Sequence, residues 1–113
     1  METERIQNQL KALNLFIKNS LENQKNFIRD STPEEFKAIV ECVYNAKRLV
    51  ESSGEKELLK QYKIIFTYLD KRKTLSLSKT KTLFVNNCSI IEHLVGLSLK
   101  AIYYDSLCTV LNG

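Results

Sequence analysis

The chain has 113 residues, of which 43% are apolar and 27% charged, and its formal net charge is +4. This length and composition fit one globular domain with a single modest core, and they exclude a disordered, collagen-like or disulfide-rich protein. No run of about 18 uncharged apolar residues is present and the N-terminus lacks the order of a signal peptide, so we expect an intracellular protein that is neither membrane-spanning nor secreted.

Two helical elements are predicted near the N-terminus. In the first, over residues 3–21, apolar residues recur at intervals of three and four and therefore form one stripe along a helix. The stripe consists of Ile6, Leu10, Leu13, Ile17 and Leu21. The second is a short element over residues 23–29, in which Phe27 and Ile28 lie together.

A third helix is predicted to begin at Pro33. Thr32 supplies a hydroxyl cap, proline favours the first helical position, and Glu35 can reach back to the backbone N–H of the cap. The residues expected on the core side are Phe36, Ile39, Val40, Val43, Lys47 and Val50. Ser52-Ser53-Gly54 should end the helix, because glycine readily adopts a positive φ.

One amphipathic helix is predicted over residues 55–70. Its apolar residues fall within one sector of the helix, which indicates a core-facing stripe. They are Leu58, Leu59, Tyr62, Ile65, Phe66 and Leu69. The lysines Lys56, Lys60, Lys63 and Lys71 fall nearly opposite and form a lysine row.

The segment 74–85 is compatible with two structures. The alternation of Leu75 and Leu77 with hydroxyl residues suits a strand or a small hairpin. We favour a helix over residues 78–86, capped by Ser76 or Ser78, because no partner strand is visible elsewhere in the sequence. Leu75 and Leu77 are expected to be packed anchors.

A last helix is predicted from Ser89 to about residue 111, since Ser89 and Glu92 repeat the capping-box pattern. Its apolar residues occupy most of the circumference, which is typical of a helix at the centre of a bundle. They are Ile90, Leu94, Val95, Leu97, Leu99, Ile102, Tyr103, Leu107 and Val110. We therefore predict a compact all-α domain over residues 1–113, a bundle of five or six helices with the last helix largely buried.

No motif in the chain predicts an enzyme. His93, the single histidine, lies five residues from Cys88, and a nucleophilic pair would need the two side chains within hydrogen-bond reach. A lone histidine is more often solvated or hydrogen-bonded. No glycine-rich phosphate loop and no metal-ligand spacing is present, so no cofactor or metal is expected. Cys42, Cys88 and Cys108 are odd in number and far apart, which predicts reduced thiols packed as small hydrophobic side chains.

The excess positive charge lies in the middle of the chain. Residues 55–81 carry eight Lys or Arg against three Asp or Glu, whereas residues 1–54 carry eight of each and residues 82–113 one against two. If the helix over 55–70 and the next helix turn back on each other, these cations converge into one face for nucleic-acid phosphates or an acidic partner. The predicted binding residues are Lys56, Lys60, Lys63, Lys71, Arg72, Lys73, Lys79 and Lys81.

Several alternatives to a nucleic-acid face stay open. A lysine row opposite an apolar stripe is also what a solvated amphipathic helix shows. Thr74, Ser76 and Ser78 follow basic residues and match a phosphorylation site, and the run matches a weak nuclear-import patch. Few side chains suited to reading base edges lie in the region, so any nucleic-acid contact is predicted to be non-specific. A membrane partner is not expected, because charged residues interrupt the last helix.

A series of residues in the second and third quarters of the chain resembles the sequence pattern of a known family. It comprises Glu41-Cys42, Asn45, Glu55-Lys56, Leu59-Lys60, Tyr62-Lys63, Leu69, Lys73, Leu75-Ser76-Leu77, Lys79, Lys81, Leu83 and Val85. Over residues 35–95 the chain is similar to a short basic protein of Maverick or Polinton virus-like DNA transposons and their adenovirus-like viral relatives. That family has a lysine-rich run of the form VSLKKKKKLLVQ followed by glycines. Here Ser78, Thr80 and Thr82 replace lysines and Asn86-Asn87 replace glycines, which weakens an inherited DNA-binding role.

The resemblance implies a small core or minor virion protein. The leading hypothesis is therefore a non-enzymatic accessory or structural protein of a virus or virus-like element, located in the host nucleus or cytoplasm or in the virion, which contacts nucleic acid through the basic face. The alternative is a helical protein–protein interaction module, an adaptor or a homo-oligomer, in which the same face meets an acidic partner.

Overall fold

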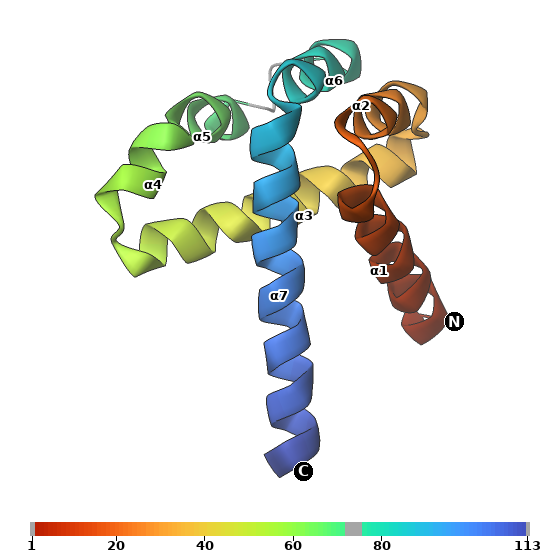
Figure 1. Cartoon of the computed structure of the whole chain (residues 1–113), viewed down its shortest axis with the longest axis vertical. Coiled ribbons are helices and arrows are strands. Elements are labelled where there is room, and N and C mark those ends of the chain that lie inside the picture. The colour runs from red at the N-terminus through yellow and green to blue at the C-terminus, as the bar shows by residue number, and fades with distance from the viewer. Residues whose placement is uncertain (1, 72–75, 113) are drawn as a thin grey trace.

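The chain folds into helices that pack around one another (Figure 1). The computed structural model describes residues 2–71 and 76–112, with the side chains of all of these except positions 2, 3, 5, 6, 9 and 103–112. The helices are α1 (Glu2–Lys18), α2 (Leu21–Asp30), α3 (Pro33–Ser53), α4 (Lys56–Gln61), α5 (Lys63–Asp70), α6 (Leu77–Asn86) and α7 (Cys88–Asn112). The predicted all-α class is confirmed, and the described residues form seven helices rather than five or six.

The N-terminal stripe is divided between two helices instead of running through one. Ser20 has an extended backbone, and its hydroxyl accepts a hydrogen bond from the backbone N–H of Asn23 at 3.3 Å, so a new helix begins at Leu21. Leu13 is buried as expected, whereas Leu21, now on α2, remains 42% exposed. The predicted stripe residue Ile6 lies outside the described side chains.

The predicted capping box at the start of α3 is confirmed. The Thr32 hydroxyl accepts from the backbone N–H of Glu35 at 3.2 Å, and the Glu35 carboxylate accepts from the backbone N–H of Thr32 at 2.9 Å. These hydrogen bonds hold the pKa of Glu35 below its usual value. At the other end of α3, Gly54 has a φ of 69°, which confirms the prediction that a glycine with positive φ ends this helix.

Replacing Thr32 by alanine should lower the free energy of unfolding by about 1 kcal/mol, because the first turn of α3 loses a side-chain acceptor. Urea denaturation followed by circular dichroism measures the change. Thr67→Ala, at an exposed position of α5, is the matched control and should change stability by less than about 0.5 kcal/mol. Equal effects of the two substitutions would contradict the assigned cap.

The single helix predicted over 55–70 is wrong, because the chain breaks at Tyr62. Tyr62 has φ of −99° and ψ of 7°, and it separates α4 from α5. The Tyr62 side chain is buried, and its ring packs edge-on against Phe66 with centroids 5.8 Å apart. The predicted core side is otherwise right, since Tyr62, Ile65, Phe66 and Leu69 are buried and Leu58 and Leu59 pack against them.

Residues 77–86 form the helix α6, so the strand or hairpin alternative is wrong for the described part of the segment 74–85. Ser76 caps α6 by accepting from the backbone N–H of Lys79 at 3.2 Å. Phe84 is fully buried and packs edge-on against Phe36 of α3, with ring centroids 5.2 Å apart. Leu77 is 44% exposed and is therefore not the packed anchor expected, and Leu75 lies outside the described residues.

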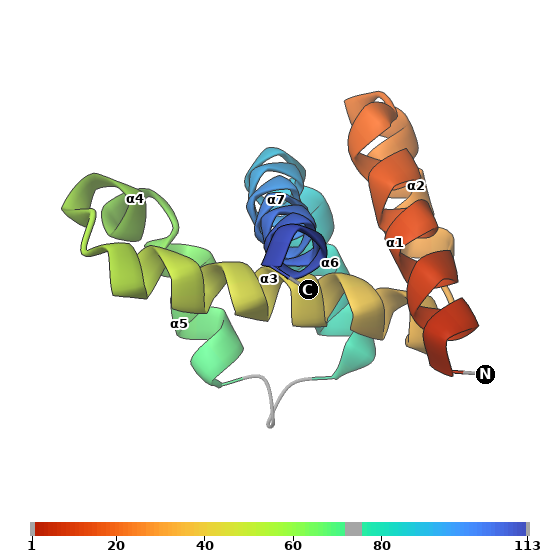
Figure 2. The ribbon, with the colours of Figure 1, turned by 90° about the horizontal axis from the view of Figure 1, so that it is seen from below.

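The helix α7 crosses α3 at the centre of the molecule, with α1 and α2 on one side and α4 and α5 on the other (Figure 2). Its buried residues Ile91, Leu94, Val95 and Leu99 form the middle of the core. The predicted serine cap is wrong, because Ser89 lies inside the helix, which follows α6 directly at Cys88. The Ile91 backbone N–H donates instead to the Asn87 carbonyl at 3.0 Å.

The prediction that α7 is largely buried is confirmed for Ile91, Leu94, Val95 and Leu99, and it is not tested for residues 103–112. The ribbon of its second half extends beyond the other helices (Figure 1). The predicted apolar residues Tyr103, Leu107 and Val110 lie outside the described side chains. Within the described part of the chain, no helix is long and apolar enough to cross a membrane.

Candidate functional site

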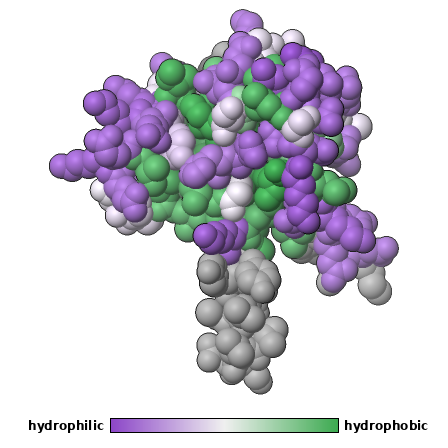
Figure 3. Space-filling model, in the orientation of Figure 1, coloured by the Kyte–Doolittle hydropathy of each residue, from purple (hydrophilic) through white to green (hydrophobic). Residues whose placement is uncertain are grey.

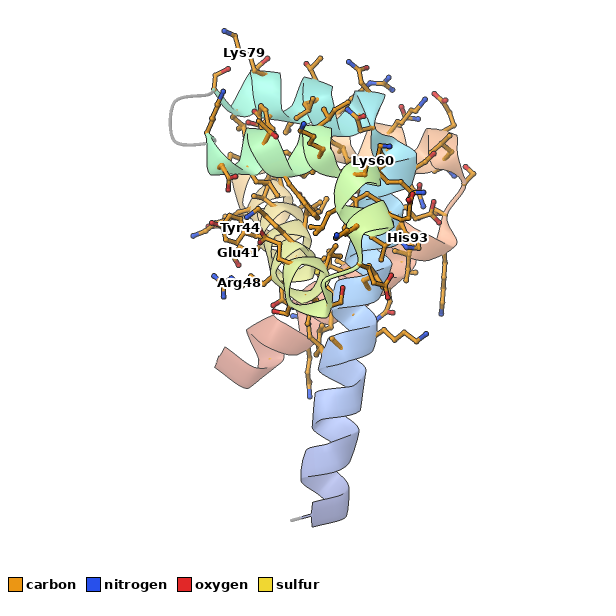
Figure 4. All side chains as sticks on the ribbon, turned by 90° about the vertical axis from the view of Figure 1, so that its left-hand side faces the viewer. Glu41, Tyr44, Arg48, Lys60, Lys79 and His93 are labelled. Carbon is orange, nitrogen blue, oxygen red and sulfur yellow. The ribbon has the colours of Figure 1, made fainter. Side chains whose placement is uncertain are left out.

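The helices α5 and α6 turn back on each other and form an antiparallel pair at the edge of the molecule (Figures 2 and 4). A short hydrogen bond between the Tyr68 hydroxyl and the Thr80 hydroxyl joins them. The Thr80 hydroxyl also donates to the Ser76 carbonyl at 2.9 Å, which fixes its orientation. The hydrogen bond and the short connection between the two helices place Lys63 of α5 and Lys79 of α6 on neighbouring helices.

Five of the predicted binding residues are exposed on α4, on α5, directly after α5 and on α6. Lys60 lies on α4, and Lys79 lies on α6 next to the connection between α5 and α6 (Figure 4). We call these five residues the basic face: Lys56, Lys60, Lys63, Lys71 and Lys79. In the space-filling view, hydrophilic residues cover the surface over α4 (Figure 3). Arg72 and Lys73 lie outside the described residues.

Lys81 has a different environment from the rest of the predicted set. Its ammonium donates to the carbonyl of Ser31 at 2.6 Å and to the carbonyl of Arg29 at 3.3 Å, and it lies 5.8 Å from the centre of the Phe36 ring. A cation at this position stabilises the carbonyl end of α2. Lys81 therefore joins α6 to α2, with part of its hydrogen-bonding capacity already used.

One of the three acidic residues in the segment 55–81, Asp70, forms an ion pair with a lysine of α3. Asp70 is the one acidic residue between positions 58 and 81, and its carboxylate lies 3.2 Å from the ammonium of Lys47 in α3. Lys47 also contacts Glu51 at 3.1 Å. Burial opposes the charged form of Lys47, but the hydrogen bonds to Glu51 and Asp70 outweigh it and raise the pKa above its usual value. The permanent cation at Lys47 thus offsets the charge of Asp70 beside the basic face.

Arg29 is a cation that sequence reasoning missed. It is exposed at the end of α2 and lines a groove of about 460 Å³ with Ser78, Lys81 and Thr82 of α6. Its backbone carbonyl accepts from Lys81, so the two residues are neighbours although 52 positions separate them. Nothing local in the sequence could indicate this contact. Asp30 follows Arg29 directly, so α2 extends the surface without adding net charge.

No protein-family model, curated protein or solved structure matches the chain.

The two groups considered for nucleophilic chemistry face different neighbours. The Cys88 thiol is buried and lies 3.8 Å from the Gln24 side-chain oxygen, to which it donates. His93 is exposed, and its ring lies 5.9 Å from that of Tyr62, centre to centre. Burial raises the pKa of both the Cys88 and the Cys42 thiols, so these two thiols stay protonated and behave as small packed side chains.

Cys108 lies outside the described side chains. Among the side chains that the structure describes, no cluster of histidine, cysteine and carboxylate residues could hold a metal ion.

Proposed function

We propose that the chain is a non-enzymatic accessory or minor structural protein of a virus or virus-like element, and that it contacts nucleic acid without sequence specificity through the basic face. The observation that carries the proposal is the charge balance of that face. Its five lysines are exposed, and of the three acidic residues in the segment 55–81, Glu55 and Glu57 flank Lys56 whereas Asp70 is paired with Lys47. Phosphate groups are the ligands that such a row of exposed lysine ammonium groups attracts.

The chemistry of the face favours contacts to the phosphate backbone. Lysine presents a compact charge on a flexible stem, whereas base recognition relies on the planar groups of arginine, asparagine or glutamine. The viral setting rests on the resemblance over residues 35–95 and gives the expected location, the host nucleus or cytoplasm or the virion. The replacement of family lysines by Ser78, Thr80 and Thr82 agrees with weak binding, which depends on the lysines that remain.

A triple charge reversal tests the proposal. Lys60→Glu, Lys63→Glu and Lys79→Glu together should lower the affinity for a fluorescent DNA duplex by at least about a hundredfold at low salt, since three phosphate contacts become repulsive. Fluorescence anisotropy, with duplex and single-stranded DNA, measures the affinity. Circular dichroism checks that the helices are retained.

The matched control reverses three exposed lysines outside the face, Lys11, Lys18 and Lys100, and so produces the same net charge. If binding depends on the basic face, this control should weaken binding by only a few fold through long-range repulsion. Equal losses in the two variants would show that net charge alone drives binding. Absence of wild-type binding at low salt would reject the nucleic-acid proposal.

A helical protein–protein interaction module is the second candidate function. The observation that favours it is Ile64 of α5, which is 65% exposed and follows Lys63 directly. An exposed aliphatic side chain contributes little to a phosphate backbone, whereas apolar anchors surrounded by charges are common at protein interfaces.

A further inference from the structure

A groove of about 640 Å³ lies between α1 and the first half of α3. Its floor contains the apolar side chains of Leu13, Phe27 and Ile39. Its walls carry four glutamates and one lysine, namely Glu4, Glu34, Glu35, Glu41 and Lys37. An apolar floor with a predominantly acidic rim fits an apolar side chain that is flanked by basic ones.

The glutamates of this rim differ in their availability. Glu35 is engaged in the capping box of α3 and is therefore part of the scaffold. Glu34 is exposed, and Glu41 is 63% exposed and lies 4.0 Å from Lys37 in a solvated contact. Exposed pairs of this kind contribute little energy, so Glu41 can exchange its partner at small cost.

A matching surface lies on the same chain. Ile64 is the most exposed of the large hydrophobic residues described, and it belongs to the outer side of α5. Lys63, which precedes it in the sequence, is also exposed. Ile64 with Lys63 is thus an exposed apolar side chain next to a basic one, and we call this pair the Ile64 knob.

From this complementarity we infer that the protein associates head to tail, with the Ile64 knob of one copy in the acidic groove of a second copy. The helices α1 and α5 lie on opposite sides of α7 (Figure 1). The two surfaces cannot therefore meet within one molecule, and one copy can engage two neighbours. Such a heterologous contact produces rings or filaments rather than closed two-fold dimers. The inference does not depend on nucleic-acid binding, although both uses involve Lys63 and would compete for it.

Sedimentation velocity of the full chain over a wide range of concentration tests the inference. The wild type should form species larger than a dimer, and association should weaken as salt rises, because the contact pairs opposite charges. Ile64→Ser should remove the knob, and Glu34→Lys with Glu41→Lys should invert the rim of the groove. Each variant should weaken association by at least about tenfold.

Mixing the two variants gives the decisive result. The Ile64→Ser protein keeps an intact groove and the E34K/E41K protein keeps an intact knob, so the mixture should form a one-to-one dimer that neither variant forms alone. Leu15→Ser is the matched control, since Leu15 is 63% exposed on α1 and should be neutral. A monomeric wild type, an undiminished Ile64→Ser variant or a mixture that stays monomeric would each overturn the inference.

The same variants separate this inference from the nucleic-acid proposal. Ile64→Ser should bind DNA as the wild type does, because it retains every lysine of the basic face. Lys79→Glu should weaken DNA binding and leave self-association unchanged, since Lys79 belongs to α6 and not to the Ile64 knob. Failure of one proposal therefore leaves the other standing.

Discussion

Replacing Phe84 by alanine should lower the free energy of unfolding by about 3–5 kcal/mol, the largest effect that we expect from one substitution. Phe84 is fully buried in α6 and packs edge-on against Phe36 of α3. The substitution removes the apolar transfer energy of the ring, leaves a cavity and eliminates the aromatic contact. Because α6 carries Lys79, the loss should also loosen the scaffold of the basic face.

Chemical denaturation of the wild type and the Phe84→Ala variant measures this effect. Phe27→Ala is the matched control, because Phe27 is only partly buried on α2 and its loss should cost clearly less. A loss below about 1 kcal/mol for Phe84→Ala would contradict the packing of α6 on α3.

Replacing Gln24 by leucine should destabilise the fold by about 1–3 kcal/mol even though the side-chain volume is nearly conserved. Gln24 is fully buried, and its amide donates to the carbonyls of Phe16 at 3.0 Å and Asn19 at 3.2 Å. Its oxygen accepts from the Cys88 thiol of α7. Leucine would leave these buried groups at the turn between α1 and α2 with fewer partners, and that loss outweighs the gain in hydrophobic surface.

The control for Gln24→Leu is Gln61→Leu, at an exposed position at the end of α4. Since the exposed amide is solvated in both the folded and the unfolded state, this change should stay within about 0.5 kcal/mol. Thermal unfolding by calorimetry and urea titration provide independent measurements. A Gln24→Leu protein as stable as the wild type would show that the buried amide does not hold the turn.

Local sequence signals identified the start of α3, the glycine that ends it and the cap of α6, because each is a contact between residues three or fewer positions apart. The buried side of α5 was also predictable, since the helical period alone places Ile65, Phe66 and Leu69 together. The capping-box pattern at Ser89 and Glu92 was misleading, because α7 already begins at Cys88. The direct passage from α6 into α7 leaves no room for a separate serine cap.

Features that depend on distant residues could not be predicted. The break at Tyr62 was not predicted, and the contact of the Tyr62 ring with His93 of α7 joins residues that are distant in the sequence. Lys81 resembles every other lysine of the basic segment, yet it stabilises the end of α2 through carbonyls 50 and 52 positions away. The neutralisation of Asp70 by Lys47 is likewise a contact between α3 and α5. The charge composition of the segment was therefore sufficient to propose the surface, whereas the roles of Lys81 and Asp70 could be found only from tertiary contacts.

The salt dependence of duplex-DNA binding tests the central claim most directly. With four or five phosphate contacts from the basic face, a plot of log affinity against log salt concentration should have a slope of about −4, so affinity should fall roughly a hundredfold or more between 50 and 200 mM salt. In the K60E/K63E/K79E variant the slope should approach about −1, because most of these contacts are lost. A wild-type slope near zero, or the same slope in both proteins, would contradict a phosphate-binding role for the basic face.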